Sequence, residues 1–212
     1  SAEQTQLSDA LDGILAGDYI ASDGTDTRNY GGLDGLLEAK ALFGQMLGVP
    51  AQEVLVGGNS SLALMYRVVD FAERSGFGRP WLRSDASAPK ILCPSPGYDR
   101  HFAICDYLGI EMIPIPMLDT GPDMDAAERA IAQHDNVCGI WCVPRFSNPT
   151  GCIYSDETLA RLVALPKGAS SHFLILYDNA YAVHALTSDA PALGNIRDYA
   201  LAAETEDHLI QF

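Results

Sequence analysis

The chain has 212 residues, of which 48% are hydrophobic and 19% charged, so it can bury a substantial core, which argues against global disorder. Twenty-eight acidic residues against 13 basic ones give a formal net charge of −15, which argues against nucleic acid or an anionic membrane as the main partner. No apolar run reaches the ~20 residues of a membrane helix, and the start of the chain does not resemble a secretory signal.

Apolar residues alternate along the chain between helical spacing and short β-rich runs. In chain order the pattern predicts a helix at 7–15, a helix at 33–47, a strand at 54–56, a helix at 62–72, a strand at 91–93, a helix at 98–108, a strand at 112–115, a helix at 124–131, a strand at 139–143, a helix at 156–165, and strands at 173–177 and 209–212. Glycines such as Gly48 and Gly109 end helices, and Ser155 is a candidate N-cap.

This alternation predicts the fold class. Strands separated by helices need crossover connections, and these produce an α/β fold with a mostly parallel sheet and helices on both faces. The only sizeable loop, residues 75–89, is interpreted as a surface excursion within one domain. Length alone allows one large domain or, less readily, two small ones.

The five cysteines are an odd and sparse set, which favours a reducing, cytoplasmic compartment. His134, Cys138 and Cys142 recur every four residues, so on a helix they would share one face and could bind zinc. The run Cys138–Val143 is instead typical of an apolar strand, and a fourth ligand is missing. We therefore interpret these cysteines as buried thiols and expect no metal.

Polar and aromatic residues follow four of the predicted strands, where an open parallel sheet binds its ligands. The four segments are Gly57-Gly58-Asn59-Ser60-Ser61, Pro94-Ser95-Pro96-Gly97-Tyr98, Pro144-Arg145-Phe146-Ser147-Asn148-Pro149-Thr150-Gly151 and Asp178-Asn179-Ala180-Tyr181. They offer a phosphate-type loop, an aromatic ring, an amide and a carboxylate. Together these groups could hold a flat, phosphorylated, cationic heterocycle.

Each segment also has a simpler interpretation. Asn59, Ser60 and Ser61 could only cap a helix, and the Asn148 segment could be an ordinary turn. Tyr98 could be a core aromatic, and Asp178 could cap a helix. Their joint occurrence at strand ends favours a ligand site over these separate explanations.

Four motifs carry a resemblance to a known superfamily: Gly58-Asn59-Ser60-Ser61, Pro96-Gly97-Tyr98-Asp99-Arg100-His101, Ser147-Asn148-Pro149-Thr150-Gly151 and Asp178-Asn179-Ala180-Tyr181. With these motifs the sequence resembles the fold-type I pyridoxal-5′-phosphate (PLP) enzymes, the aminotransferase class I/II superfamily. The segment 29–36 is similar more narrowly to bacterial type Ic aspartate aminotransferases, also called MocR-family aminotransferases. The resemblance runs along essentially all of residues 1–212 and implies most of the PLP-binding large domain.

The resemblance implies roles for the motif residues around the PLP ring. Asp178 would pair with the pyridine nitrogen, and His101 would orient that carboxylate. Asn148 and Tyr181 would donate hydrogen bonds to the phenolate oxygen of the ring. Tyr98 would stack on the ring face.

It also implies a phosphate site and a homodimer. Asn59, Ser60 and Ser61 would receive the phosphate at the positive end of the following helix. Tyr30 would reach the phosphate of the neighbouring subunit.

The resemblance places the catalytic lysine beyond Phe212. The lysines present, Lys40, Lys90 and Lys167, do not fit that position. The lysine segment and the C-terminal small domain are therefore expected to be absent from residues 1–212, and this chain alone is expected to be inactive.

We interpret the parent protein as a PLP-dependent transaminase that moves an amino group between an amino acid, aspartate first, and a 2-oxo acid, 2-oxoglutarate. Arg28, Arg100 and Arg145 are candidates to bind substrate carboxylates. Alternatives are another fold-type I PLP activity, β-lyase or decarboxylase, and the PLP-binding effector domain of a MocR-type transcription regulator. No Gly-x-Gly-x-x-Gly motif opens the helix after a first strand, which argues against a nicotinamide-dependent oxidoreductase.

Overall fold

The computed structural model describes residues 20–27, 32–78, 80–82, 87–185, 187 and 189–212. The chain divides into two compact units, Ser1–Gly57 and Gly58–Phe212. The helix predicted at 7–15, and Tyr30, lie outside the described residues. Arg28, a candidate to bind substrate carboxylates, also lies outside the described residues. The remaining residues predicted for the site, from Asn59 onward, fall in the second unit.

The described part of the first unit contains helix α2 (Leu37–Leu47) and the short 3₁₀ helix η1 (Ala51–Glu53). Helix α2 ends where the sequence predicts, at Gly48, whose φ of 68° is left-handed and suits a glycine C-cap. The prediction of a strand at 54–56 was wrong. These residues have no strand beside them in the described part of the unit. The Val56 N–H bonds the Asp34 carbonyl at 2.9 Å, and the Val54 N–H bonds the Ala51 carbonyl at 3.2 Å, which is a turn contact. Three apolar residues in a row are too weak a signal without a pairing partner.

In the second unit, six strands of the described residues form one sheet with the spatial order β3-β2-β1-β4-β5-β6. The strands are β1 (Lys90–Ser95), β2 (Glu111–Leu118), β3 (Gly121–Pro122), β4 (Val137–Cys142), β5 (Leu174–Tyr177) and β6 (Leu209–Gln211). All pairings are parallel except that of β3 with β2, which is antiparallel. The five parallel strands therefore direct their carboxyl ends toward the same edge.

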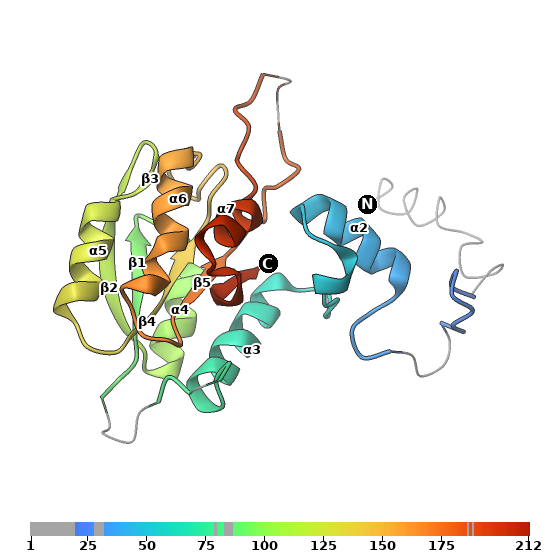
Figure 1. The fold of residues 1–212 in the computed structure, drawn as a ribbon, viewed down its shortest axis with the longest axis horizontal. Helices are drawn as coiled ribbons and strands as arrows, with labels where there is room; N and C mark the ends of the chain where they lie inside the picture. The colour runs from blue at the N-terminus through green and yellow to red at the C-terminus, as the bar shows by residue number, and fades with distance from the viewer. Residues whose placement is uncertain (1–19, 28–31, 79, 83–86, 186, 188) are drawn as a thin grey trace, which may run out of the picture. The chain divides into compact units, whose positions relative to one another are not determined.

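Helices cover both faces of this sheet (Figure 1). They are α3 (Ser61–Arg74), α4 (Asp99–Leu108), α5 (Met124–Gln133), α6 (Asp156–Ala164) and α7 (Ile196–Ala203), with 3₁₀ helices η2 (Leu165–Lys167) and η3 (Glu206–His208). One core cluster joins the sheet to α3 and α4, and the other joins it to α5, α6 and α7. On β5, Leu174 and Leu176 belong to the first cluster and Ile175 and Tyr177 to the second. Successive residues of β5 point to opposite faces of the sheet, and both faces are covered by a core cluster. The strand is therefore apolar at every position.

The predicted mostly parallel α/β fold with helices on both faces is thus confirmed. The N-cap at Ser155 is confirmed as well, since its Oγ accepts the Thr158 N–H at 3.1 Å. The sequence did not predict β3, which is two residues long, or α7, which buries only Ile196 and Ala200 and so has a short apolar stripe. Among the described helices, none is long and apolar enough to cross a membrane.

Candidate functional site

The carboxylate of Asp178 is buried at the carboxyl end of β5, with 4% of the residue exposed. Its backbone N–H donates to the Cys142 carbonyl at 2.8 Å, and its Oδ1 accepts the Ala180 N–H at 3.2 Å. Its Oδ2 lies 3.0 Å from Nε2 of His101. An ionised carboxylate can only accept, so Nε2 of the imidazole donates in this pair. These bonds fix the carboxylate and compensate for its loss of water.

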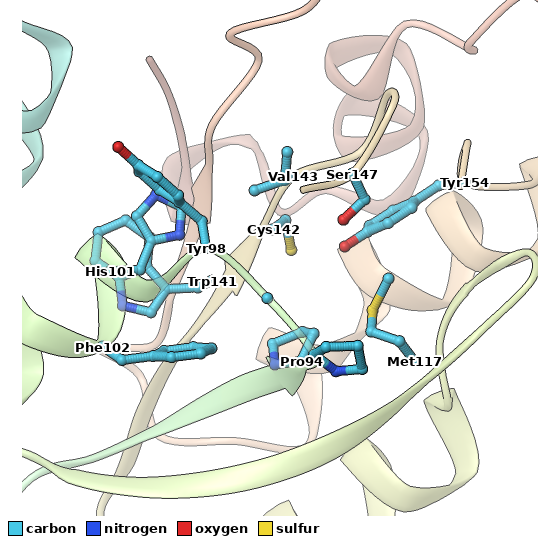
Figure 2. A pocket seen from close by; sticks show the side chains of 12 residues that line it. Pro94, Tyr98, His101, Phe102, Met117, Trp141, Cys142, Val143, Ser147 and Tyr154 are labelled. Atoms are coloured by element: carbon cyan, nitrogen blue, oxygen red, sulfur yellow. The ribbon is translucent and has the colours of Figure 1, made fainter. Parts of the chain in front are cut away.

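The imidazole of His101 is held between two aromatic side chains. His101 lies in the first turn of α4 and is 1% exposed. The indole of Trp141, on β4, stacks on it with ring centroids 4.2 Å apart and planes within 7°. Tyr98 meets it edge-on, with centroids 5.0 Å apart and an 89° angle (Figure 2). The orientation of the ring that bonds Asp178 is therefore set by its neighbours.

The loop between β1 and α4 presents Tyr98 at the same edge of the sheet. A Cβ on Gly97 would lie 2.3 Å from the Pro94 carbonyl oxygen, so only glycine fits before the tyrosine. Figure 2 shows the pocket that this loop forms with β4 and the segment after it. The pocket is lined by Pro94, Pro96, Gly97, Tyr98, His101, Phe102, Met117, Trp141, Cys142, Val143, Ser147 and Tyr154.

Two groups on the wall of this pocket stay protonated at neutral pH. Burial raises the pKa of the Cys142 thiol far above its usual range. Burial likewise raises the pKa of the Tyr154 phenol well above its ordinary value, and the nearby Cys142 adds to this. Neither side chain can therefore act as an anion here.

The Asn148 and Tyr181 loops follow the adjacent strands β4 and β5. In the first loop the Ser147 N–H donates to the Cys152 carbonyl at 3.0 Å, and the Gly151 N–H donates to the Ser147 carbonyl, which leaves Asn148 exposed. Arg145 joins the two loops, because its Nη1 donates to the carbonyl oxygen of Ala182. The residue after Tyr181 is thereby tied to the loop that carries Asn148.

The segment Asn59-Ser60-Ser61 lies at the N-terminus of the 14-residue helix α3. The Oγ of Ser60 accepts the Ala63 N–H at 3.3 Å, so Ser60 is the N-cap. All three side chains are exposed at this end of the helix, where backbone N–H groups and the helix dipole favour an anion. The capping and the phosphate interpretations therefore describe the same position.

The structure brings Tyr98, His101 and Asp178 into one contiguous group and places Asn148 and Tyr181 on neighbouring loops. Sequence reasoning gave Trp141 no role at the site. The only available signal was its place in an apolar strand, and this does not identify the ring that it contacts. Arg145, a predicted candidate for substrate carboxylates, uses its guanidinium to bond a backbone carbonyl.

Cys138 and Cys142, considered for zinc, pack in different core clusters on the two faces of the sheet. All five cysteines are free thiols. Within the described ranges no group of three or more His, Cys, Asp or Glu residues could hold a metal ion.

Comparison with known proteins gives consistent matches. A sequence model described as aspartate amino-transferase matches residues 1–211. An aspartate aminotransferase of Corynebacterium glutamicum is 43% identical over 200 residues, which are 92% of this chain and 45% of that protein. The chain therefore spans about half the length of the curated relatives that it matches.

Solved structures agree with these sequence matches. The crystal structure of an aspartate transaminase from C. glutamicum has a TM-score of 0.83 and 41% identity, over 96% of this chain and 49% of that one. The α-aminoadipate aminotransferase LysN of Thermus thermophilus, complexed with N-(5′-phosphopyridoxyl)-L-leucine, has a TM-score of 0.70 at 20% identity, over 98% of this chain and 47% of that one. The second likeness shows a shared fold.

Proposed function

The chain belongs to the aspartate amino-transferase family, and from this premise we propose that it forms most of the PLP-binding large domain of an aminotransferase. The observation that carries the proposal is the buried pair of His101 and Asp178 at the carboxyl edge of the sheet. A buried carboxylate that is fixed by an imidazole is suited to pair with a cationic ring nitrogen.

The residues present fit PLP by their chemistry. The Asp178 carboxylate has about four acceptor positions, and His101 and the Ala180 N–H use one on each oxygen. Acceptor capacity therefore remains for a protonated pyridine nitrogen. The N-terminus of α3 offers backbone N–H groups and the Ser60 and Ser61 hydroxyls to a phosphate.

When bound, PLP supplies a protonated ring that accepts the electrons released at the substrate Cα. In our proposal Asp178 keeps the ring nitrogen protonated, and His101 keeps Asp178 in place. Tyr98 covers one face of the ring, and Asn148 and Tyr181 donate hydrogen bonds to its phenolate oxygen.

The three lysines of the chain lie away from this edge or in the other unit. Lys90 begins β1 and bonds the Asp135 carbonyl, so it lies at the amino end of the sheet. Lys167 is in η2, which precedes β5, and Lys40 pairs with Asp34 in the first unit. We therefore propose that the lysine that carries PLP, and the small domain, come from sequence outside residues 1–212.

We propose aspartate as the amino donor and 2-oxoglutarate as the acceptor, supported by the 43% identical aspartate aminotransferase. The test uses the full-length protein with PLP, aspartate and 2-oxoglutarate, and it measures glutamate by chromatography. Glutamate should accumulate only when PLP is present. If none forms above a PLP-free control, the transaminase proposal is overturned. Ammonia or carbon dioxide released from the amino acid would instead identify a lyase or a decarboxylase.

We also propose that the protein acts in the cytoplasm as a homodimer without nucleic acid. The family resemblance supports the dimer, and the net charge of −15 opposes binding to nucleic acid. Light scattering of the full-length protein after gel filtration should give twice the monomer mass, and a monomer mass would contradict the dimer.

A further inference from the structure

Trp141 lies behind the site and makes contacts that point to a role beyond filling the core. We propose that Trp141 is a positioning residue: through His101, it holds the Asp178 carboxylate in the orientation that pairs with the ring nitrogen of PLP. The inference rests on the proposed function, because it concerns affinity for the same cofactor.

The rings of Trp141 and His101 are in direct contact. With centroids 4.2 Å apart and planes within 7°, the indole stacks on one face of the imidazole. Rotation of the His101 ring about its Cβ–Cγ bond would drive a ring edge into the indole. Nε2 therefore stays directed at Oδ2 of Asp178, 3.0 Å away.

Trp141 is itself held in place by its neighbours. It is 1% exposed on β4, where it pairs in register with Leu176 of β5. Its Nε1 donates to Sγ of Cys105 at 3.4 Å. Cys105 follows His101 by four residues on α4, so the two side chains share one face of that helix. The indole thus contacts this face of α4 twice, by stacking on His101 and by the hydrogen bond to Cys105, and so connects the helix to β4.

Trp141 directly precedes Cys142, which also contacts Asp178. The carbonyl of Cys142 accepts the Asp178 N–H at 2.8 Å, so β4 already fixes the backbone of Asp178. The preceding residue, Trp141, fixes the carboxylate end of the same side chain through His101. Two consecutive residues of β4 therefore hold both ends of Asp178.

The test measures the Kd of PLP for the full-length apoprotein by equilibrium dialysis, together with the absorbance spectrum of bound PLP as a function of pH. Trp141→Phe keeps a flat ring, so its Kd should stay within about 3-fold of wild type. Trp141→Leu removes the flat surface, so its Kd should rise about 10-fold or more, and the pH midpoint of the bound-PLP spectrum should shift.

A double-mutant cycle separates positioning from a general loss of packing. His101→Phe keeps a ring against the indole but cannot bond Asp178. In that background Trp141→Leu should change the Kd by less than about 2-fold, because no imidazole remains to be oriented. An equal rise in both backgrounds would show a merely structural role and overturn the inference.

Trp81 provides the matched control. It is also 1% exposed, belongs to the same core cluster as Trp141, and donates its Nε1 to the His172 carbonyl at 2.9 Å. Trp81→Leu should lower the melting temperature and leave the Kd of PLP unchanged. If Trp141→Leu behaves like Trp81→Leu, the inference is wrong. If the wild-type apoprotein binds no PLP, the proposed function itself fails, which is a different result.

Discussion

The Nε2 of His101 and the Oδ2 of Asp178 lie 3.0 Å apart, although the two residues are separated by 77 positions in the sequence. His101 comes from the first turn of α4, after β1, and Asp178 follows β5. The parallel order of the sheet brings both to the same edge, with β4 between β1 and β5. The fold thus buries the Asp178 carboxylate, and the hydrogen-bond donor to that carboxylate comes from a helix that follows a different strand.

The first prediction concerns the charge of Asp178. In the full-length enzyme, Asp178→Asn should lower kcat by roughly 10²–10³, because an amide accepts from His101 but cannot stabilise a protonated ring nitrogen. Steady-state glutamate formation measures this change. Asp125→Asn is the control, since Asp125 is exposed and pairs with Arg161 on the surface. Equal activity in both variants would contradict the role of Asp178.

A second prediction separates capping from phosphate binding at Ser60. Ser60→Ala and Ser155→Ala each remove an N-cap, that of α3 and that of α6. Each should lower the free energy of unfolding by about 0.5–2 kcal/mol. Only Ser60→Ala should also weaken the binding of PLP, with a Kd that rises a few-fold. The same Kd in both variants would show that Ser60 only caps α3.

A third prediction concerns Arg145, which connects the Asn148 and Tyr181 loops through the Ala182 carbonyl. Arg145→Gln should weaken the binding of PLP, because it releases the contact between the two loops. It should also lower kcat/KM by a similar factor for aspartate and for a monocarboxylic donor such as alanine, because both donors depend on the same loops. Arg145→Lys should restore part of the loss. A selective loss with aspartate would show instead that Arg145 binds the second substrate carboxylate.

The parts of this site that the sequence could predict depend on local pattern. Residues that follow a strand must lie at its carboxyl end, so Asp178 and Tyr98 could be placed from the order of elements alone. Ser155 could be identified as a cap because capping involves residues three positions apart. The strand at 54–56 failed for the opposite reason, since a strand exists only if another strand lies beside it.

The parts that could not be predicted depend on contacts between distant residues. Trp141 bonds Cys105 across 36 positions, and Arg145 bonds Ala182 across 37. The local sequence predicts that a tryptophan in an apolar strand is buried, but it does not determine which ring the tryptophan contacts. Likewise, an arginine near a motif can bind a substrate or a backbone carbonyl, and only the fold decides between them.

The last prediction concerns Tyr177, whose hydroxyl is buried without a hydrogen-bond partner among the described residues. Burial, with a further contribution from Cys142, raises its pKa far above the ordinary value of 10.0. Below about pH 10 the phenol is protonated in both states, so its titration does not change stability with pH. Above that pH the unfolded chain loses the proton while the folded chain retains it. Stability should therefore fall by about 1.4 kcal/mol per pH unit from this residue.

Tyr177→Phe should remove that part of the alkaline loss. At pH 7 it should also leave the free energy of unfolding unchanged or raise it by up to about 1 kcal/mol, since an unpaired buried hydroxyl is replaced by hydrogen. Tyr199→Phe is the contrast, because the Tyr199 hydroxyl donates to Oδ1 of Asp156 at 2.7 Å and its loss should destabilise the protein. Urea unfolding of both variants between pH 7 and about pH 11 measures these changes. A Tyr177→Phe variant that is less stable than wild type at pH 7 would mean that the hydroxyl makes a stabilising hydrogen bond.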